Sequence, residues 1–160
     1  MEVGGLPLHP LVVHAAVTLI PLSAALAIVF AVFPRWRWLL RWPTLLAALG
    51  AVVVAWLARL SGHALFDELN PQLQERVGTH LERGDLLSWL VIPFAILVLV
   101  ACWSLAGETA LASGSGRRDS QLPALEGVLP AVLVLASLAI IVLTIMTGDA
   151  GSRAVWGSGG

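Results

Sequence analysis

Four long apolar blocks constrain the fold of this chain more than any other feature of its sequence. A helix needs about 20 mostly apolar residues to cross the hydrocarbon core of a bilayer. The chain has four such stretches, at residues 11–33, 43–60, 86–106 and 128–146. Of its 160 residues, 58% are hydrophobic and 12% are charged, whereas about 25% of the residues of a soluble domain are charged. We therefore predict an all-α integral membrane protein, an up-down-up-down four-helix bundle whose first and third helices lie diagonally opposite.

Charge and cysteine content exclude several other classes of protein. Nine Arg, no Lys and ten acidic residues give a formal net charge of −1, which leaves no basic surface that could follow a phosphate backbone. Cys102 is the only cysteine in the sequence, so an intrachain disulfide cannot form. We expect the lipid bilayer as a partner and no nucleic acid.

The charges between the spans predict how the bundle is oriented. Four crossings place both termini on one side, which carries four Arg against seven acidic residues, a net charge of −3. The other side carries five Arg against three acidic residues, a net charge of +2. Because cytoplasmic loops are enriched in Lys and Arg, both termini are predicted to be extracytoplasmic. The predicted organisation is a single membrane domain at 1–156, with an extracytoplasmic loop containing a short helical segment at 61–85, a cytoplasmic linker at 107–127, and a flexible tail at 157–160.

All four histidines fall on the predicted outward side, at His9, His14, His63 and His80. His14 stands inside the first span, where an imidazole is a candidate ligand or proton relay. The alternative is a structural His14 that is hydrogen-bonded to a backbone carbonyl. Asn70 and Pro71 predict a helix start, since Asn caps helices and Pro suits the first helical position. His80 would then lie in this helix, about 9 Å outside the start of the third span.

These histidines suggest two kinds of site. The first is haem b with His14 and His80 as axial ligands to the iron, or with His63 as one of them. Its anionic propionates would pair with outward arginines, for which the candidates are Arg59, Arg76, Arg83 and Arg153. The diagonal helices favour the pair of His14 and His80, whereas their different depths oppose it. The second site is a divalent cation held by His63, His80 and Asp67, with a hydrated loop as the alternative.

Small residues recur at helical spacing on two spans. They predict either a groove for a cofactor or plain helix packing, which such faces commonly serve in membranes. The residues are Ala48, Ala51, Ala55, Ala58 and Gly62 on the second span, and Ser137, Ile141, Thr144, Gly148 and Gly151 on the fourth.

The start and the close of the chain carry a resemblance. Residues 8–14 (LHPLVVH) and 147–156 (TGDAGSRAVW) resemble the bacterial membrane protein family called domain of unknown function 2231, over roughly residues 6–156. The resemblance implies a four-span protein of the bacterial cell membrane, with a layout similar to that of small b-type cytochromes. Ala15 and Ser152 depart from the family pattern, where Phe and Gly are usual.

Two functions follow as hypotheses. The first is a haem b protein of membrane electron transfer. The second is a non-catalytic accessory or scaffold subunit, with structural histidines, bound to a larger membrane or respiratory complex or to a second copy of the chain. We expect no enzyme activity of the chain alone, because no nucleophile can be paired with a base. Four short crossings with no internal repeat and few midplane polar groups disfavour a transporter or channel.

Overall fold

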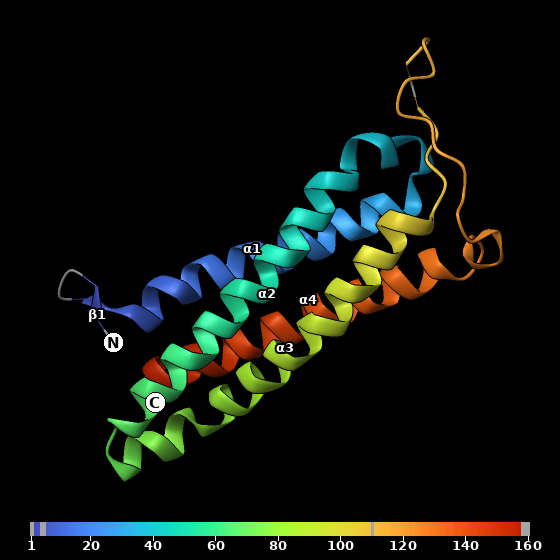
Figure 1. The fold of residues 1–160 in the computed structure, drawn as a ribbon. Coiled ribbons are helices and arrows are strands. Elements are labelled where there is room, and N and C mark those ends of the chain that lie inside the picture. The colour runs from blue at the N-terminus through green and yellow to red at the C-terminus, as the bar shows by residue number, and fades with distance from the viewer. Residues whose placement is uncertain (1, 4–5, 110, 158–160) are drawn as a thin grey trace.

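The computed structural model describes residues 2–3, 6–109 and 111–157, and four long helices dominate it (Figure 1). The helices are α1 (Leu8–Val32), α2 (Arg37–Asp67), α3 (Pro71–Ser104) and α4 (Leu129–Trp156). Minor elements are the paired strands β1 (Glu2–Val3) and β2 (Leu6–Pro7) and the 3-10 helices η1 (Pro34–Trp36) and η2 (Pro123–Leu125). Each of the four predicted spans matches a helix long and apolar enough to cross a membrane, apart from one or two residues at the ends of three of them, which confirms the all-helical membrane fold.

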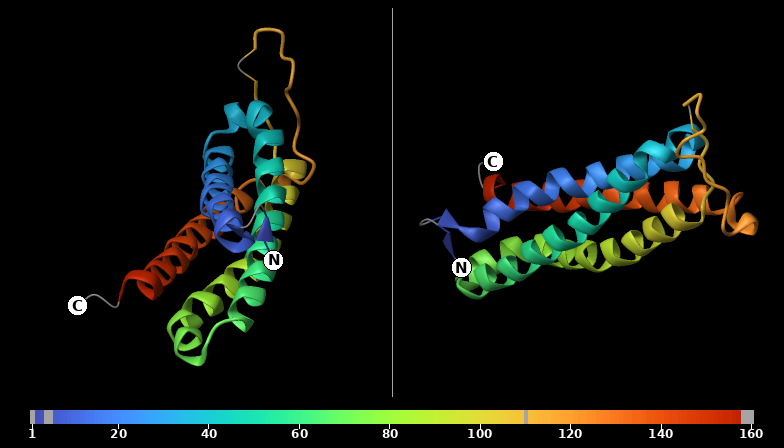
Figure 2. Two further views of the ribbon diagram at one scale, coloured as in Figure 1. Left: turned by 90° about the vertical axis from the view of Figure 1, so that its left-hand side faces the viewer. Right: turned by 45° about the horizontal axis from the view of Figure 1, so that its top comes forward.

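The helices pack as a ring around one core. Each helix contacts its neighbours in the chain, and α1 closes the ring against α4. Consecutive helices run in opposite directions, and they spread apart toward the end that holds both termini (Figures 1 and 2). Phe30, Leu133 and Val98 are fully buried in the core. The diagonal pairs, α1 with α3 and α2 with α4, therefore face each other across it.

The small-residue faces pack inside this ring. Ala48 and Ala51 of α2 and Ser137 of α4 are fully buried. Small side chains let neighbouring helix backbones approach closely. The inner part of each face therefore serves helix packing. The outward part lines a cavity, at Ala55, Ala58 and Gly62 of α2 and at Thr144, Gly148 and Gly151 of α4.

Residues 61–85 differ from the predicted loop. The helix α2 continues to Asp67 and α3 begins at Pro71, so only residues 68–70 connect them. The Asn70 side chain accepts a hydrogen bond from the Leu73 backbone N–H at 2.9 Å, which confirms the predicted helix start. The expected loop was too long because polarity marks where a span leaves the apolar layer, and a helix does not need to end there.

Residues 107–127 connect α3 to α4 and are largely irregular, as expected of a linker. Gly107 and Arg118 exchange two backbone hydrogen bonds of 2.9 Å, which tie the base of the linker. At the other end of α4, Gly157 ends the helix, and the rest of the predicted tail, 158–160, lies outside the described residues.

Arg37 closes the bundle beside this linker. Its side chain is buried and donates hydrogen bonds to the backbone carbonyls of Phe30 at 3.0 Å, Ala31 at 3.1 Å and Ala106 at 2.8 Å. Glu126 lies 3.5 Å from the same guanidinium and accepts a hydrogen bond from the Ala106 N–H. We call this group the arginine clamp. It satisfies carbonyls at the ends of α1 and α3 that have no partner within their own helices.

Candidate functional site

A cavity of about 700 Å³ lies at the end of the bundle that holds both termini. All four helices line it, mostly with apolar side chains, and its polar lining includes His9, His14, Arg59, His80 and Asp85. Mostly apolar cavities of about 300–1,000 Å³ with a few convergent polar groups are typical of cofactor and ligand sites. We call this space the histidine cavity.

The tautomer of His9 is set by α2. Its Nδ1 lies 3.1 Å from the Ala58 carbonyl oxygen and 3.2 Å from Ser61 Oγ. A carbonyl oxygen only accepts hydrogen bonds, so Nδ1 must carry the proton. In the neutral imidazole, Nε2 therefore keeps its lone pair, the form in which histidine binds metals.

His80 is held in the same way by α4. Its Nδ1 donates to the Thr147 carbonyl oxygen at 2.9 Å, which again leaves Nε2 with its lone pair. The His9 and His80 ring centroids are 6.4 Å apart, at an interplanar angle of 74°. The closest pair of imidazoles thus joins the diagonal helices α1 and α3.

Two glycines allow the rings to lie against the neighbouring helices. A Cβ atom at Gly62 would lie 3.0 Å from His9 Cε1, and one at Gly151 would lie 2.9 Å from His80 Nδ1. Both distances are too short for ordinary contact. Each glycine therefore makes room for an imidazole.

The arrangement repeats between the two halves of the chain. In each half the histidine donates to a carbonyl of the next helix, and the glycine beneath the ring follows that carbonyl by four residues. This similarity is confined to two local contacts, and the expectation that the chain has no internal repeat stays a prediction. The similarity is not visible in the residue types, because the acceptors are backbone atoms of Ala58 and Thr147.

His14 also lines the histidine cavity but is exposed at its edge. Its Nδ1 donates to the Pro10 carbonyl oxygen, one turn earlier in α1, at 2.6 Å. This contact is the backbone hydrogen bond expected of a structural His14. It also leaves Nε2 unprotonated in the neutral ring, so a ligand role for His14 stays a prediction.

His63 and Arg59 meet at a shared carboxylate between α2 and α3. Asp85 Oδ1 lies 2.8 Å from His63 Nε2 and 2.9 Å from Arg59 Nε. The Arg59 guanidinium also packs against the rings of Trp56 and Trp89, at 5.1 and 5.6 Å from their centroids. Arg59 lines the histidine cavity, whereas His63 does not. Since His63 already uses Nε2, the structure does not favour it as an axial ligand.

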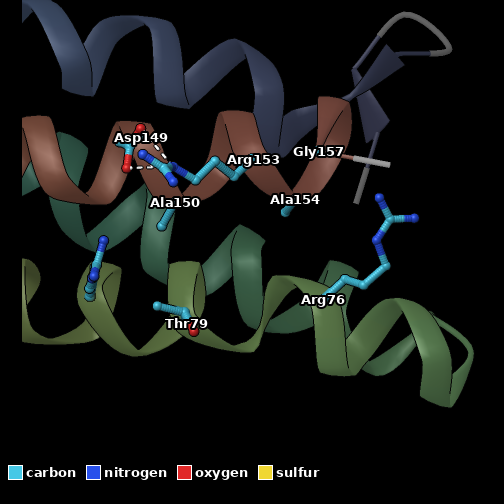
Figure 3. A pocket seen from close by; sticks show the side chains of 8 residues that line it. Arg76, Thr79, Asp149, Ala150, Arg153, Ala154 and Gly157 are labelled. Atoms are coloured by element: carbon cyan, nitrogen blue, oxygen red, sulfur yellow. Dashed lines mark hydrogen bonds and ion pairs between the residues drawn. The ribbon is translucent and has the colours of Figure 1, made fainter. Parts of the chain in front are cut away.

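Arg153 lies at a different place. It pairs with Asp149 at 2.9 Å and lines a second cavity between α3 and α4 (Figure 3), which adjoins the histidine cavity at Ala154. Arg76 and Arg83 line that second cavity as well. The three outward arginines predicted as propionate partners together with Arg59 therefore belong to another group.

The predicted divalent-cation site is contradicted. Within residues 2–3, 6–109 and 111–157, no group of three or more His, Cys, Asp or Glu side chains is placed to hold a metal ion. His63 binds Asp85, and His80 faces the histidine cavity from α3. The pair of His9 and His80 is a separate matter, because the ring of a haem supplies the other four ligands to its iron.

Sequence reasoning gave His9 no role as a ligand. A signal was available, because His9 precedes the first apolar block and His80 also lies outside its own. His14 and His80 lie at different depths relative to the apolar layer, which opposed their pairing. The same comparison would have favoured His9 as the partner of His80.

The comparisons with known proteins place the chain in a family. A family model described as "Predicted membrane protein (DUF2231)" matches residues 5–160. No curated protein and no solved structure matches the chain.

Proposed function

The chain belongs to the DUF2231 family of predicted membrane proteins, and we propose that it binds haem b in the histidine cavity and takes part in membrane electron transfer. We assign it to the bacterial cell membrane as a multi-pass protein. The observation that carries the proposal is the pair His9 and His80. Each imidazole has its Nδ1 proton bound to a carbonyl and its Nε2 uncommitted in an apolar cavity.

The separation of the two rings supports a shared iron. Metal–imidazole bonds are about 2 Å long, so two histidines that would hold one iron must lie close to each other. The observed centroid distance is 6.4 Å. Hydrogen bonds from Nδ1 to carbonyls also fix ring orientation and raise the basicity of the ligating nitrogen.

The remaining lining also suits haem. The cavity is largely apolar and reaches across the diagonal helices, as a flat aromatic cofactor requires. Arg59 donates to Asp85 through Nε, and the guanidinium has four further N–H groups that could bind a propionate. When bound, haem supplies a one-electron iron couple whose potential depends on its axial ligands and burial.

The proposal includes an orientation. The excess of arginine on the side of the 107–127 linker supports a cytoplasmic location for that side. Both termini and the histidine cavity would then lie on the extracytoplasmic side. Electrons would be exchanged with a donor or acceptor at that surface.

Absorbance spectra of four variants test the proposal. Wild-type protein made with haem supplied should show a Soret band that shifts on reduction with dithionite. His9→Ala and His80→Ala should each lose most of the band. His63→Ala is the matched control and should keep it, because His63 does not line the cavity.

His14→Ala separates the two possible pairs of axial ligands. If it keeps the band, His9 and His80 are the pair; if it loses the band and His9→Ala does not, His14 replaces His9. A wild-type protein with no Soret band would refute the proposal.

The accessory-subunit alternative receives no support from the small-residue faces, because they are used inside the bundle. Association with a larger membrane or respiratory complex, or with a second copy, stays a prediction. Size measurement in mild detergent tests it, and a lone monomer would contradict it.

A further inference from the structure

The second cavity lies in the outer groove between α3 and α4 and has a volume of about 380 Å³. Its lining from α3 is Arg76, Thr79 and Arg83, and Asp149 and Arg153 face them from α4 (Figure 3). We call it the arginine groove. It shares Ala154 with the histidine cavity but none of the histidines.

The charges in the groove do not balance. Three arginines and a single carboxylate line the groove, and Arg153 pairs with that carboxylate, Asp149, at 2.9 Å. Arg83 donates from Nη1 to the Met146 carbonyl at 2.8 Å, which uses one of its five N–H groups. No hydrogen bond or ion pair to Arg76 is found among the residues that the structure describes. Two positive charges are thus left over in one concave site.

Helix capping does not account for this excess. Arg153 lies in the last turn of α4, where a cation is favoured by the helix dipole. Arg76 and Arg83 instead lie in the first half of α3, far from the carbonyls at its end. They share the groove with a threonine hydroxyl, a further donor for an oxyanion.

The inner end of the groove lies at the depth of the headgroup layer. Arg83 precedes Leu86, the first residue of the predicted apolar span, by three residues, or about 4.5 Å along the helix. The layer between hydrocarbon and water is about 5–7 Å thick on each side of a bilayer, so Arg83 lies level with lipid phosphates. Arg76 precedes Leu86 by ten residues, or about 15 Å along the helix, and its long side chain would approach such a phosphate from the aqueous side.

We propose that the arginine groove binds a phosphate group, supplied by the headgroup of an anionic phospholipid. Arg76 and Arg83 would provide charge-assisted hydrogen bonds, and Thr79 a neutral one. The proposal does not depend on haem binding.

The test compares lipids and two matched double variants. The thermal unfolding midpoint is measured in detergent with added phosphatidylglycerol or with zwitterionic phosphatidylcholine. Arg76→Gln/Arg83→Gln removes two charges from the groove. Arg35→Gln/Arg117→Gln removes two charges from exposed positions at the other end.

Phosphatidylglycerol should raise the midpoint of the wild type and of the control more than phosphatidylcholine does. In the groove variant, its apparent affinity should fall about tenfold or more, the loss expected for charge-assisted hydrogen bonds. Equal effects of the two lipids on the wild type would overturn the proposal. An unchanged response of the groove variant would do the same.

Inorganic phosphate distinguishes the two sources of the ligand. If millimolar phosphate alone stabilises the wild type but not the groove variant, the phosphate site stands and its ligand is a free phosphate; if it has no effect, the lipid is supported. Should the double variant fail to fold, Arg76→Gln alone serves, since no described contact depends on that side chain.

Discussion

At the linker end of the bundle, the Arg37 guanidinium gives its hydrogen bonds to three backbone carbonyls and its charge to Glu126. At the other end, His9 and His80 each bind one carbonyl and keep a second nitrogen uncommitted. Both ends place polar side chains among apolar helices. In the arginine clamp the polar groups complete the helix ends, whereas in the histidine cavity backbone carbonyls hold the two imidazoles and leave one nitrogen of each without a partner.

This contrast indicates that the polar groups of the arginine clamp stabilise the fold and that those of the histidine cavity are arranged for binding. Buried polar groups stabilise a fold when their partners are complete. A ligand site instead needs a cavity and polar atoms that have no hydrogen-bond partner within the protein. Disrupting the arginine clamp should therefore lower the free energy of unfolding. Disrupting the histidine cavity should weaken ligand binding more than it lowers stability.

Removing Arg37 should have the largest effect on stability. Arg37→Ala leaves carbonyls at the ends of α1 and α3 without a donor and leaves Glu126 without its cation. We expect a loss of about 3 kcal/mol in the free energy of unfolding, measured by denaturation in detergent. Arg35→Ala, at an exposed position two residues earlier, is the control and should change little. A loss below about 1 kcal/mol for Arg37→Ala would contradict the clamp.

Filling the glycine positions should affect binding more than folding. Gly62→Ala and Gly151→Ala each place a methyl group about 3 Å from an imidazole. We expect the rings to shift, most of the Soret band to be lost, and unfolding to become about 1–3 kcal/mol easier through overpacking.

Gly78→Ala is the matched control, because Gly78 lies in α3, lines neither cavity, and a Cβ there has no neighbour within 4 Å. In helices such a change is neutral or stabilising by up to about 1 kcal/mol. If all three variants behave alike, the close contacts between glycine and histidine have no functional meaning.

Much of the fold could be predicted from the sequence. Four apolar blocks identified four membrane-spanning helices, and Asn70 with Pro71 marked the start of α3. The length of α2 could not be predicted in this way, because its last turns are polar and outside the apolar block. Hydropathy reports where the bilayer ends, and it does not report where the backbone stops being helical.

The site was predicted less completely. The sequence indicated the correct end of the bundle and included His80 and Arg59, which line the cavity. It placed His63 and Arg153 there too, although neither lines the cavity and each binds a neighbouring carboxylate, Asp85 or Asp149. These pairings depend on the rotation of each helix about its axis, which packing decides. His9 was missed although its place before the first apolar block was visible, because its hydrogen bond to the Ala58 carbonyl is not shown by any sequence pattern.

Acid should weaken the arginine clamp through Glu126. Burial acts to raise the pKa of this carboxyl, but hydrogen bonds from Ala106 N–H and Ser120 and the nearby Arg37 guanidinium outweigh it and hold the pKa below its usual range. Glu126 therefore stabilises the fold above its unfolded pKa of about 4.3. That contribution is lost as the pH falls from there through the lower folded pKa.

The comparison with Glu126→Gln isolates this contribution, because the other acidic residues are shared. At pH 7 the wild type should be more stable than Glu126→Gln by up to about 1 kcal/mol, and the difference should shrink toward pH 3. A difference that stays constant with pH would show that the charge of Glu126 does not matter.

The smallest effect on stability is expected for the exposed pair of Asp149 and Arg153. Both side chains are largely exposed and lie one turn apart on α4, and such pairs contribute about 0.3–0.5 kcal/mol. Asp149→Asn should therefore leave unfolding almost unchanged. It should nevertheless strengthen the stabilisation by phosphatidylglycerol, because it removes the one carboxylate that lines the arginine groove and releases Arg153. If Asp149→Asn keeps its stability and binds the lipid more tightly, the exposed pair of Asp149 and Arg153 regulates binding and contributes little to the stability of the fold. Weaker lipid binding would instead mean that Asp149 holds Arg153 in the position from which it binds phosphate.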